Sequence, residues 1–332
     1  MIRVAILSFW HVHANDYFKH ANKHPDTEVV AIWDELPERG RREATANGVA
    51  FYESLDELLG NKEIEGVIVT TPTNQHYDVL VAAANAGKHI FTEKVIAPTS
   101  QEVKGILHAV ERNHVKLTVS LPRLNDVSTL AIQDLLQQGV LGQLTLVRVR
   151  LSHNGGTAGW LPEHFFNSEQ CGGGAMIDLG CHPMYLTRLF LGMPDRVNAN
   201  YGYITGREVE DNAVATLSYK NGSIGIVEAG FVNDHSPFSI EIQGTKGTLL
   251  YGTPDAKLLV RSSLVPEYAN DWVEIKNVPS QGISAFEQWV QHIQQDTIAE
   301  ENITIAAELT QLIEAANLSN KLKRSVELHE LG

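Results

Sequence analysis

The stretch AILSFWHVHAND, residues 5–16, joins a short apolar run to a polar turn. The run Ile2–Leu7 predicts a buried first strand, and a helix is expected after the turn. In a dinucleotide-binding unit such a turn carries G-x-G-x-x-G, but here the three glycine positions hold Ser8, Trp10 and His13. The turn is therefore either a modified nucleotide-binding turn or another kind of site, such as a metal site built on His11-x-His13.

Residues 1–121 continue this alternation of strand and helix. Short apolar runs end at polar or turn residues, and the segments between several of them have helical periodicity, closed in two cases by Gly48 and Gly87. Short buried strands separated by helices predict a parallel sheet covered on both faces. We interpret residues 1–121 as a doubly wound Rossmann domain with six strands. Strands are expected at 2–7, 29–33, 66–70, 88–94 and 115–121, and helices at 38–47, 75–86 and 100–113.

The pattern changes near Pro122. A helix is expected at 127–138, and in the following run Val147, Val149 and Leu151 alternate with polar residues, which predicts a strand with one buried face. We interpret residues 122–332 as an α+β domain with a large, open, mostly antiparallel sheet, through which the chain is expected to form a homodimer or homotetramer. Further strands are expected at 196–205, 212–219, 223–232, 238–244 and 247–252, and closing helices at 284–295 and 305–323.

Composition narrows the function. The formal net charge of −14 argues against broad contact with nucleic acid, which needs a basic surface. Two cysteines, Cys171 and Cys181, provide neither a disulfide framework nor a zinc pattern. The N-terminal apolar run ends by Trp10 and is too short to span a membrane. These features predict a cytoplasmic protein without a membrane segment or a metal site.

Three polar positions fall at predicted strand ends: Asp34, the loop Thr70–His76, and Glu93 with Lys94. Ligands of open α/β sheets bind at the carboxyl ends of the strands. Asp34 is suited to hydrogen bonds with the adenosine ribose, and Glu35 beside it would repel a 2′-phosphate, so NAD is favoured over NADP. An ordinary loop acid or helix cap is the alternative for Asp34.

Two further features carry possible chemistry. Lys94 follows a buried strand, where a lysine is either solvated or functional. Asp178 and His182 are four residues apart, which on one helix would place both on the same face, so that the carboxylate could orient a general acid–base histidine. A simple helix-surface pair is the alternative. Three glycines at 172–174 favour the functional interpretation, because they allow a close approach.

Two stretches together resemble a known family. TPTNQH…AGKHIFTEKVIAPT and GGGAMIDLGCH are similar to motifs of the Gfo/Idh/MocA family of NAD(P)-dependent oxidoreductases, and the resemblance extends to VEDNAVATLSYKNGSIG and IQGTKGTL. It implies an N-terminal Rossmann domain, a C-terminal α/β domain with an open sheet, and hydride transfer between NAD and a secondary alcohol or ketone of a sugar, inositol or related polyol.

The resemblance also implies roles for individual residues. His182 maps to the base that takes the hydroxyl proton, Lys94 to the group that polarises the oxygen, and Asp178 to the residue that supports the pair. Arg123, Trp160 and His164 are expected to contact substrate. The residues expected to bind the cofactor are Ser8, Trp10, His11, His13, Asp34, Arg39, Thr70, Thr71, Pro72, Asn74, His76, Glu93 and Lys94.

The chain departs from the family pattern in two places. Val95 replaces the proline of E-K-P, and no glycine remains in the first turn. We expect a phosphate there to use backbone N–H groups, with a hydroxyl from Ser8 or a donor from His11 or His13.

Other functions remain open. The chain could be a nucleotide- or sugar-binding regulator without activity, or a glycoside hydrolase or dehydratase that uses NAD. A metal-dependent hydrolase with His11, His13, His76 and Asp178 as ligands is remote, because the second half lacks the βα units of a barrel.

Overall fold

The structure is a computed structural model that describes residues 1–331. The chain forms two compact units, one of residues 1–120 with 284–307 and one of residues 121–283 with those from 308 onward. The sequence analysis assigned 284–307 to the second domain, whereas the structure packs this segment in the first unit. Each unit is described by itself.

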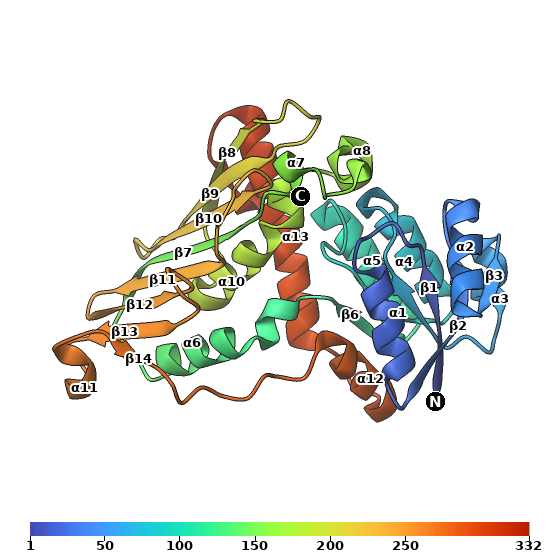
Figure 1. Cartoon of the computed structure of the whole chain (residues 1–332), viewed down its shortest axis with the longest axis horizontal. Helices are drawn as coiled ribbons and strands as arrows, with labels where there is room; N and C mark the ends of the chain where they lie inside the picture. The colour runs from blue at the N-terminus through green and yellow to red at the C-terminus, as the bar shows by residue number, and fades with distance from the viewer. Residues whose placement is uncertain (332) are drawn as a thin grey trace. The chain divides into compact units, whose positions relative to one another are not determined.

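The first unit contains a six-stranded parallel sheet in the order β3-β2-β1-β4-β5-β6. This is the Rossmann order, in which the chain reverses direction between β1 and β4 (Figure 1). The predicted parallel sheet is thus confirmed. Its strands are β1 (Ile2–Leu7), β2 (Thr27–Trp33), β3 (Ala50–Tyr52), β4 (Gly66–Val69), β5 (His89–Thr92) and β6 (Leu117–Val119).

Helices follow the strands in this unit. α5 begins with a capping box, in which Thr99 and Glu102 satisfy each other's backbone N–H groups. α2 and α4 end near the predicted Gly48 and Gly87, both of which have positive φ. The helices are α1 (Ala14–Lys23), α2 (Pro37–Asn47), α3 (Leu55–Gly60), α4 (His76–Asn85), α5 (Ser100–Arg112) and α12 (Ala285–Gln295).

α12 belongs to the first unit because of its aromatic face. Trp289 is fully buried and packs against Phe91 of β5 and Phe286 of its own helix. A Cβ on Gly66 would lie 2.9 Å from the Trp289 ring, so glycine makes room for the indole. α13 (Glu300–Leu322) begins in this unit, where Asn302 exchanges two hydrogen bonds with the backbone of Val119.

The second unit contains a nine-stranded sheet in the order β14-β13-β12-β11-β7-β10-β9-β8-β15. Only the printed pair β7 and β10 runs parallel, so the predicted mostly antiparallel sheet is confirmed. The strands are β7 (Leu144–Ser152), β8 (Arg196–Gly202), β9 (Asn212–Ser218), β10 (Ile224–Gly230), β11 (Ser239–Gly244), β12 (Gly247–Tyr251), β13 (Leu258–Ser262), β14 (Val273–Glu274) and β15 (Val326–Glu327).

The two faces of this sheet differ as the alternation in β7 predicts. Val147 and Val149 are fully buried, whereas Arg148 and Arg150 are partly exposed and both bind Glu228 of the neighbouring β10. The other helices of the unit are α6 (Val127–Gln137), α7 (Gly155–Ala158), α8 (Ser168–Cys171), α9 (Ala175–Asp178), α10 (Cys181–Leu191) and α11 (Pro266–Ala269). None of the helices in residues 1–331 has the length and apolar content needed to cross a membrane.

Candidate active site

The first turn keeps a glycine-type backbone without glycine. Ser8 has a φ of 81°, in the left-handed region that costs a non-glycine residue about 1 kcal/mol or more. Its hydroxyl oxygen accepts the Trp10 amide at 3.0 Å, and its own amide donates to the Trp33 carbonyl at 2.7 Å. The Thr70 hydroxyl donates to the Ser8 carbonyl at 2.6 Å. These bonds hold the turn against the ends of β2 and β4.

The backbone N–H groups of this turn already have acceptors within the protein. The Phe9 amide donates to Asp34 Oδ2 at 2.8 Å, the His11 amide to the Thr70 carbonyl at 3.2 Å, and the His13 amide to His11 Nδ1 at 3.3 Å. The expectation that these groups are open to a phosphate is therefore wrong at these positions. Without glycine, the turn folds onto neighbouring strand ends and side chains.

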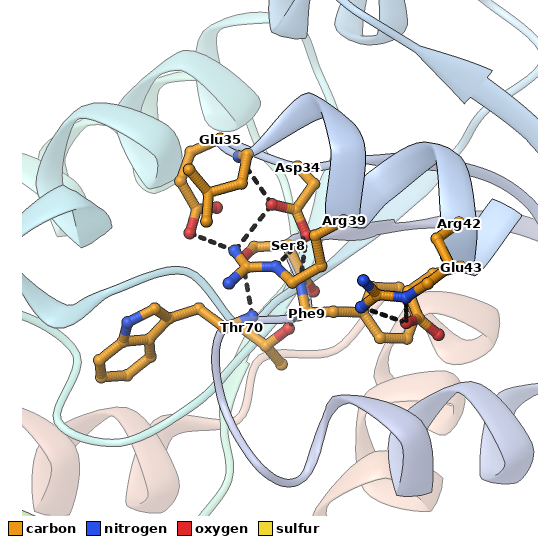
Figure 2. A network of polar contacts seen from close by, with 10 residues as sticks. Ser8, Phe9, Asp34, Glu35, Arg39, Arg42, Glu43 and Thr70 are labelled. Carbon is orange, nitrogen blue, oxygen red and sulfur yellow. Dashed lines mark hydrogen bonds and ion pairs between the residues drawn. The ribbon is translucent and has the colours of Figure 1, made fainter. Parts of the chain in front are cut away.

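Asp34 lies where β2 ends and is almost fully buried. Its Oδ1 accepts from the Leu36 amide at 2.8 Å and from Arg39 Nη2 at 2.7 Å, and Arg39 Nε donates to Oδ2 at 2.8 Å. Figure 2 shows the Arg39 guanidinium among Asp34, Glu35 and Ser8. Burial alone lowers the pKa of Arg39, but the two carboxylates raise it above its ordinary value. Asp34 is thus fixed in position, and the charge of Arg39 is neutralised.

The predicted loop after β4 is held by His76, the first residue of α4. The His76 ring is buried, with Nδ1 2.8 Å from the Val95 carbonyl and Nε2 3.2 Å from the Thr71 carbonyl. Burial lowers its pKa, so the ring is neutral and donates one proton, to one of these carbonyls. His76 therefore ties this loop to the segment after Lys94. Of the other predicted residues, Thr70, Thr71 and Pro72 are buried and Asn74 is exposed.

Glu93 is the centre of a polar cluster at the end of β5. It is 2% exposed, and its Oε1 lies 2.9 Å from His13 Nδ1, 3.5 Å from His11 Nδ1 and 2.5 Å from the Tyr17 hydroxyl, which donates to it. Burial alone would raise the pKa of Glu93, but His11, His13 and Lys94 hold it well below the ordinary value. The carboxylate is therefore ionised. Tyr17 is a member of this cluster that the sequence analysis missed.

Lys94 is buried beside this carboxylate. Only 6% of the residue is exposed, and its amide donates to Glu93 Oε2 at 3.0 Å. Val95, at the family's proline position, is also buried, and its carbonyl faces His76. A lysine that is buried beside an ionised carboxylate is a functional candidate, because such lysines are rare.

In the second unit, the predicted helix carrying Asp178 and His182 is divided. Asp178 is the last residue of α9, and His182 belongs to α10, with Leu179 and Gly180 between the two helices. The expectation of one continuous helical face is therefore wrong. Gly180 permits this break, since a Cβ there would lie 2.6 Å from the Met176 carbonyl oxygen. Asp178 acts electrostatically on His153, whose pKa is lowered by burial while Asp178 opposes that effect.

His182 has a partner that sequence reasoning missed. Its Nδ1 lies 3.0 Å from the hydroxyl of Tyr185, one turn further along α10, and that hydroxyl accepts the Arg123 amide at 3.0 Å. Burial raises the pKa of Tyr185 well above its ordinary value, so the hydroxyl keeps its proton. A hydroxyl both donates and accepts, so it can satisfy Nδ1 in either protonation state of the imidazole.

The glycine-rich loop before α9 is held by Glu210, another residue that sequence reasoning missed. Its carboxyl oxygens accept the amides of Gly174 and Met176, each at 2.9 Å. A Cβ on Gly174 would lie 2.1 Å from the Glu210 carbonyl, so only glycine fits there. Burial raises the pKa of Glu210 to about 7.

The predicted substrate residues all lie in the second unit. The Arg123 guanidinium lies 4.0 Å from the ring centre of Phe238. Trp160 is 56% exposed and its indole donates to Asn154 Oδ1 at 3.0 Å. His164 stacks at a tilt on Phe165. The structure does not bring these three into one cluster by any contact that it records.

A Rossmann sheet with a fixed acidic residue at the end of β2, followed by a unit with an open mixed sheet, defines a dinucleotide-binding protein of two units. The chain belongs to the Gfo/Idh/MocA family. Residues 4–121 match the family of oxidoreductases with an NAD-binding Rossmann fold, and residues 129–250 match a Gfo/Idh/MocA C-terminal domain. The predicted family is thus confirmed, and with it the predicted class of enzyme and cofactor.

Curated relatives are dehydrogenases and reductases. The chain is 27% identical over 231 residues to 1,5-anhydro-D-fructose reductase of Ensifer adhaerens, covering 67% of this chain and 68% of that protein. It is 25% identical over 266 residues to D-glucoside 3-dehydrogenase of Escherichia coli K12, covering 74% and 75%.

Solved structures share the fold over nearly the whole chain. An NAD-binding protein from Listeria innocua has a TM-score of 0.84 at 22% identity, covering 98% of this chain and 96% of that one. Levoglucosan dehydrogenase, in complex with NADH and levoglucosan, has a TM-score of 0.83 at 18% identity, covering 98% and 99%.

Proposed function

We propose that this protein is a dehydrogenase that transfers hydride between NAD and a CH–OH group of a sugar, inositol or related polyol. The observation that carries this proposal is the fixed Asp34 at the end of β2, where the ribose hydroxyls of a dinucleotide bind in this fold. Relatives named as acting on an inositol, an anhydrosugar and a glucoside support the substrate class.

The same residues favour NAD over NADP. Arg39 is the cation nearest Asp34 among the contacts described above, and it is engaged by Asp34 and Glu35 together. A 2′-phosphate would meet two carboxylates and one neutralised guanidinium, and the like charges disfavour it. When bound, the nicotinamide supplies the acceptor or donor of hydride.

The chain's own residues would manage the proton and the oxygen charge. We assign to His182 the transfer of the hydroxyl proton, because the Tyr185 hydroxyl can satisfy its Nδ1 before and after transfer at Nε2. Lys94 supplies a positive charge for the oxygen as its charge develops. Asp178 contributes negative charge that favours a protonated histidine, as its effect on His153 illustrates.

A screen of polyols and sugars with NAD, followed by nicotinamide absorbance, tests this function. Lys94→Ala is expected to lower turnover of the best substrate at least about a hundredfold, the lower end for a positioned electrostatic or acid–base group. Lys104→Ala, at an exposed lysine of α5, is the control. Turnover by Lys94→Ala at the wild-type rate would reject the role of Lys94, and no net reduction with any substrate would reject the dehydrogenase.

The expected assembly and compartment belong to the same proposal. The partly exposed face of the nine-stranded sheet, with Arg148, Arg150 and Glu228, would form the contact of a homodimer or homotetramer. Both cysteines are thiols, which agrees with a reducing cytoplasm. Light scattering tests the assembly, and a clean monomer at micromolar concentration would reject it.

A further inference from the structure

Three potential metal ligands converge in the first unit. His11 and His13 lie in the turn between β1 and α1, and Glu93 lies at the end of β5. One ligand atom from each residue, an imidazole nitrogen or a carboxylate oxygen, lies within 4.8 Å of the other two. The sequence analysis expected no metal site, because His-x-His alone is a weak signal and Glu93 is remote in the chain.

The polarity of these atoms favours a cation among them. His11 Nδ1 accepts the His13 amide at 3.3 Å, so this nitrogen carries a lone pair. It also lies 3.5 Å from Oε1 of the ionised Glu93. A lone pair and a carboxylate oxygen that face each other at this distance repel unless a positive charge lies between them.

The spacing is that of a tetrahedral metal site. Ligands at the usual zinc bond length of about 2.0 Å lie roughly 3.3 Å apart in a tetrahedron. The Glu93 oxygen is 2.9 Å from His13 Nδ1 and 3.5 Å from His11 Nδ1, close to that value on either side. Two histidines and one glutamate are also the ligand set of catalytic zinc sites, which keep a fourth position open.

Outer contacts support the carboxylate as a ligand. The Lys94 amide donates to Glu93 Oε2, and the Tyr17 hydroxyl donates to Oε1 and also lies 2.7 Å from the Ser120 hydroxyl. Hydrogen bonds of this kind orient metal ligands. We propose that His11, His13 and Glu93 bind a first-row divalent cation, with Zn²⁺ as the best fit.

This cation would restore a function that the turn has lost. The turn's amides are engaged within the protein, so a bound cation would supply the positive charge that a glycine-rich turn offers to a diphosphate through its backbone. This consequence depends on the proposed NAD function. The cation site itself does not, and its test contains no nucleotide.

The test uses untagged, chelator-treated full-length protein. Equilibrium dialysis against Zn²⁺ with elemental analysis is expected to show one saturable site per chain, and Co²⁺ is expected to give the visible absorption of a tetrahedral site. His13→Ala and Glu93→Gln are each expected to weaken binding at least about tenfold. His13 is 46% exposed, so its variant should fold, which circular dichroism checks.

His108→Ala, at an exposed histidine of α5, is the matched control and is expected to bind Zn²⁺ as the wild type does. Binding that is absent in the wild type, or that persists unchanged in folded His13→Ala and Glu93→Gln, would overturn the proposal.

Discussion

At the scale of single residues, side chains that are distant in sequence position the proposed catalytic groups. His76 holds the Lys94–Val95 segment, and Tyr185 contacts His182. Both positioning residues are buried, so their hydrogen bonds are shielded from water. The chemistry assigned to Lys94 and His182 therefore depends on neighbours as much as on the two residues themselves.

Tyr185→Phe tests this dependence. It removes the hydroxyl that contacts His182 Nδ1 and accepts the Arg123 amide, so we expect kcat to fall about tenfold or more and its pH profile to shift. NADH affinity should not change. Steady-state kinetics across pH and a binding titration measure these effects.

Tyr219→Phe, at a tyrosine that donates to the Gly192 carbonyl on the surface, is the control for loss of a hydroxyl. An unchanged kcat and pH profile in Tyr185→Phe would show that His182 does not rely on this contact.

At the scale of elements, buried groups fix the loops and helices that carry the site. Glu210 holds the loop before α9, and Trp289 fixes α12 on the first sheet. Neither role follows from the local pattern, because each needs partners more than thirty residues away along the chain.

Glu210 predicts a pH-dependent stability. Its pKa is about 7 in the folded protein, above the ordinary 4.5, so the folded state retains a proton that the unfolded state releases. The contribution is complete below pH 4.5 and is lost as pH rises toward about 7, a decrease in unfolding free energy on the order of 3 kcal/mol.

Glu210→Gln removes this titration. Urea unfolding at pH 5 and pH 8, on the order of one unit beyond each end of the window, should show a smaller decrease in the variant than in the wild type. Equal decreases in both proteins would show that Glu210 does not titrate in this window.

Trp289 predicts a large loss on truncation. Trp289→Ala should lower the free energy of unfolding by about 3–5 kcal/mol, because a fully buried indole leaves a cavity among Phe91 and Phe286. Trp272→Ala, at a tryptophan that is 39% exposed, should change it little. Thermal and urea unfolding compare the two, and similar losses in both would contradict the placement of α12.

At the scale of the whole molecule, the sequence predicted both sheets and the family. Periodicity located β1, β2, β4, β5 and β6, because buried parallel strands are uniformly apolar. It gave no bounds for β3 or for β13–β15, which are short or lie toward sheet edges, where the apolar pattern is weak.

Long-range pairings were beyond local patterns. The contact of His13 with Glu93 spans 80 residues, and the packing of α12 in the first unit spans more. Glycine motifs also proved an incomplete guide, because Ser8 adopts a left-handed backbone conformation by using its own hydroxyl.

The central claim is that this glycine-free unit still binds a nicotinamide dinucleotide. Titration of the purified protein with NADH and with NADPH, followed by tryptophan emission and calorimetry, tests it most directly. We predict saturable binding that is tighter for NADH, and weaker NADH binding in Asp34→Ala, which removes the carboxylate at the end of β2. No saturable binding of either nucleotide, with none co-purified, would contradict the claim.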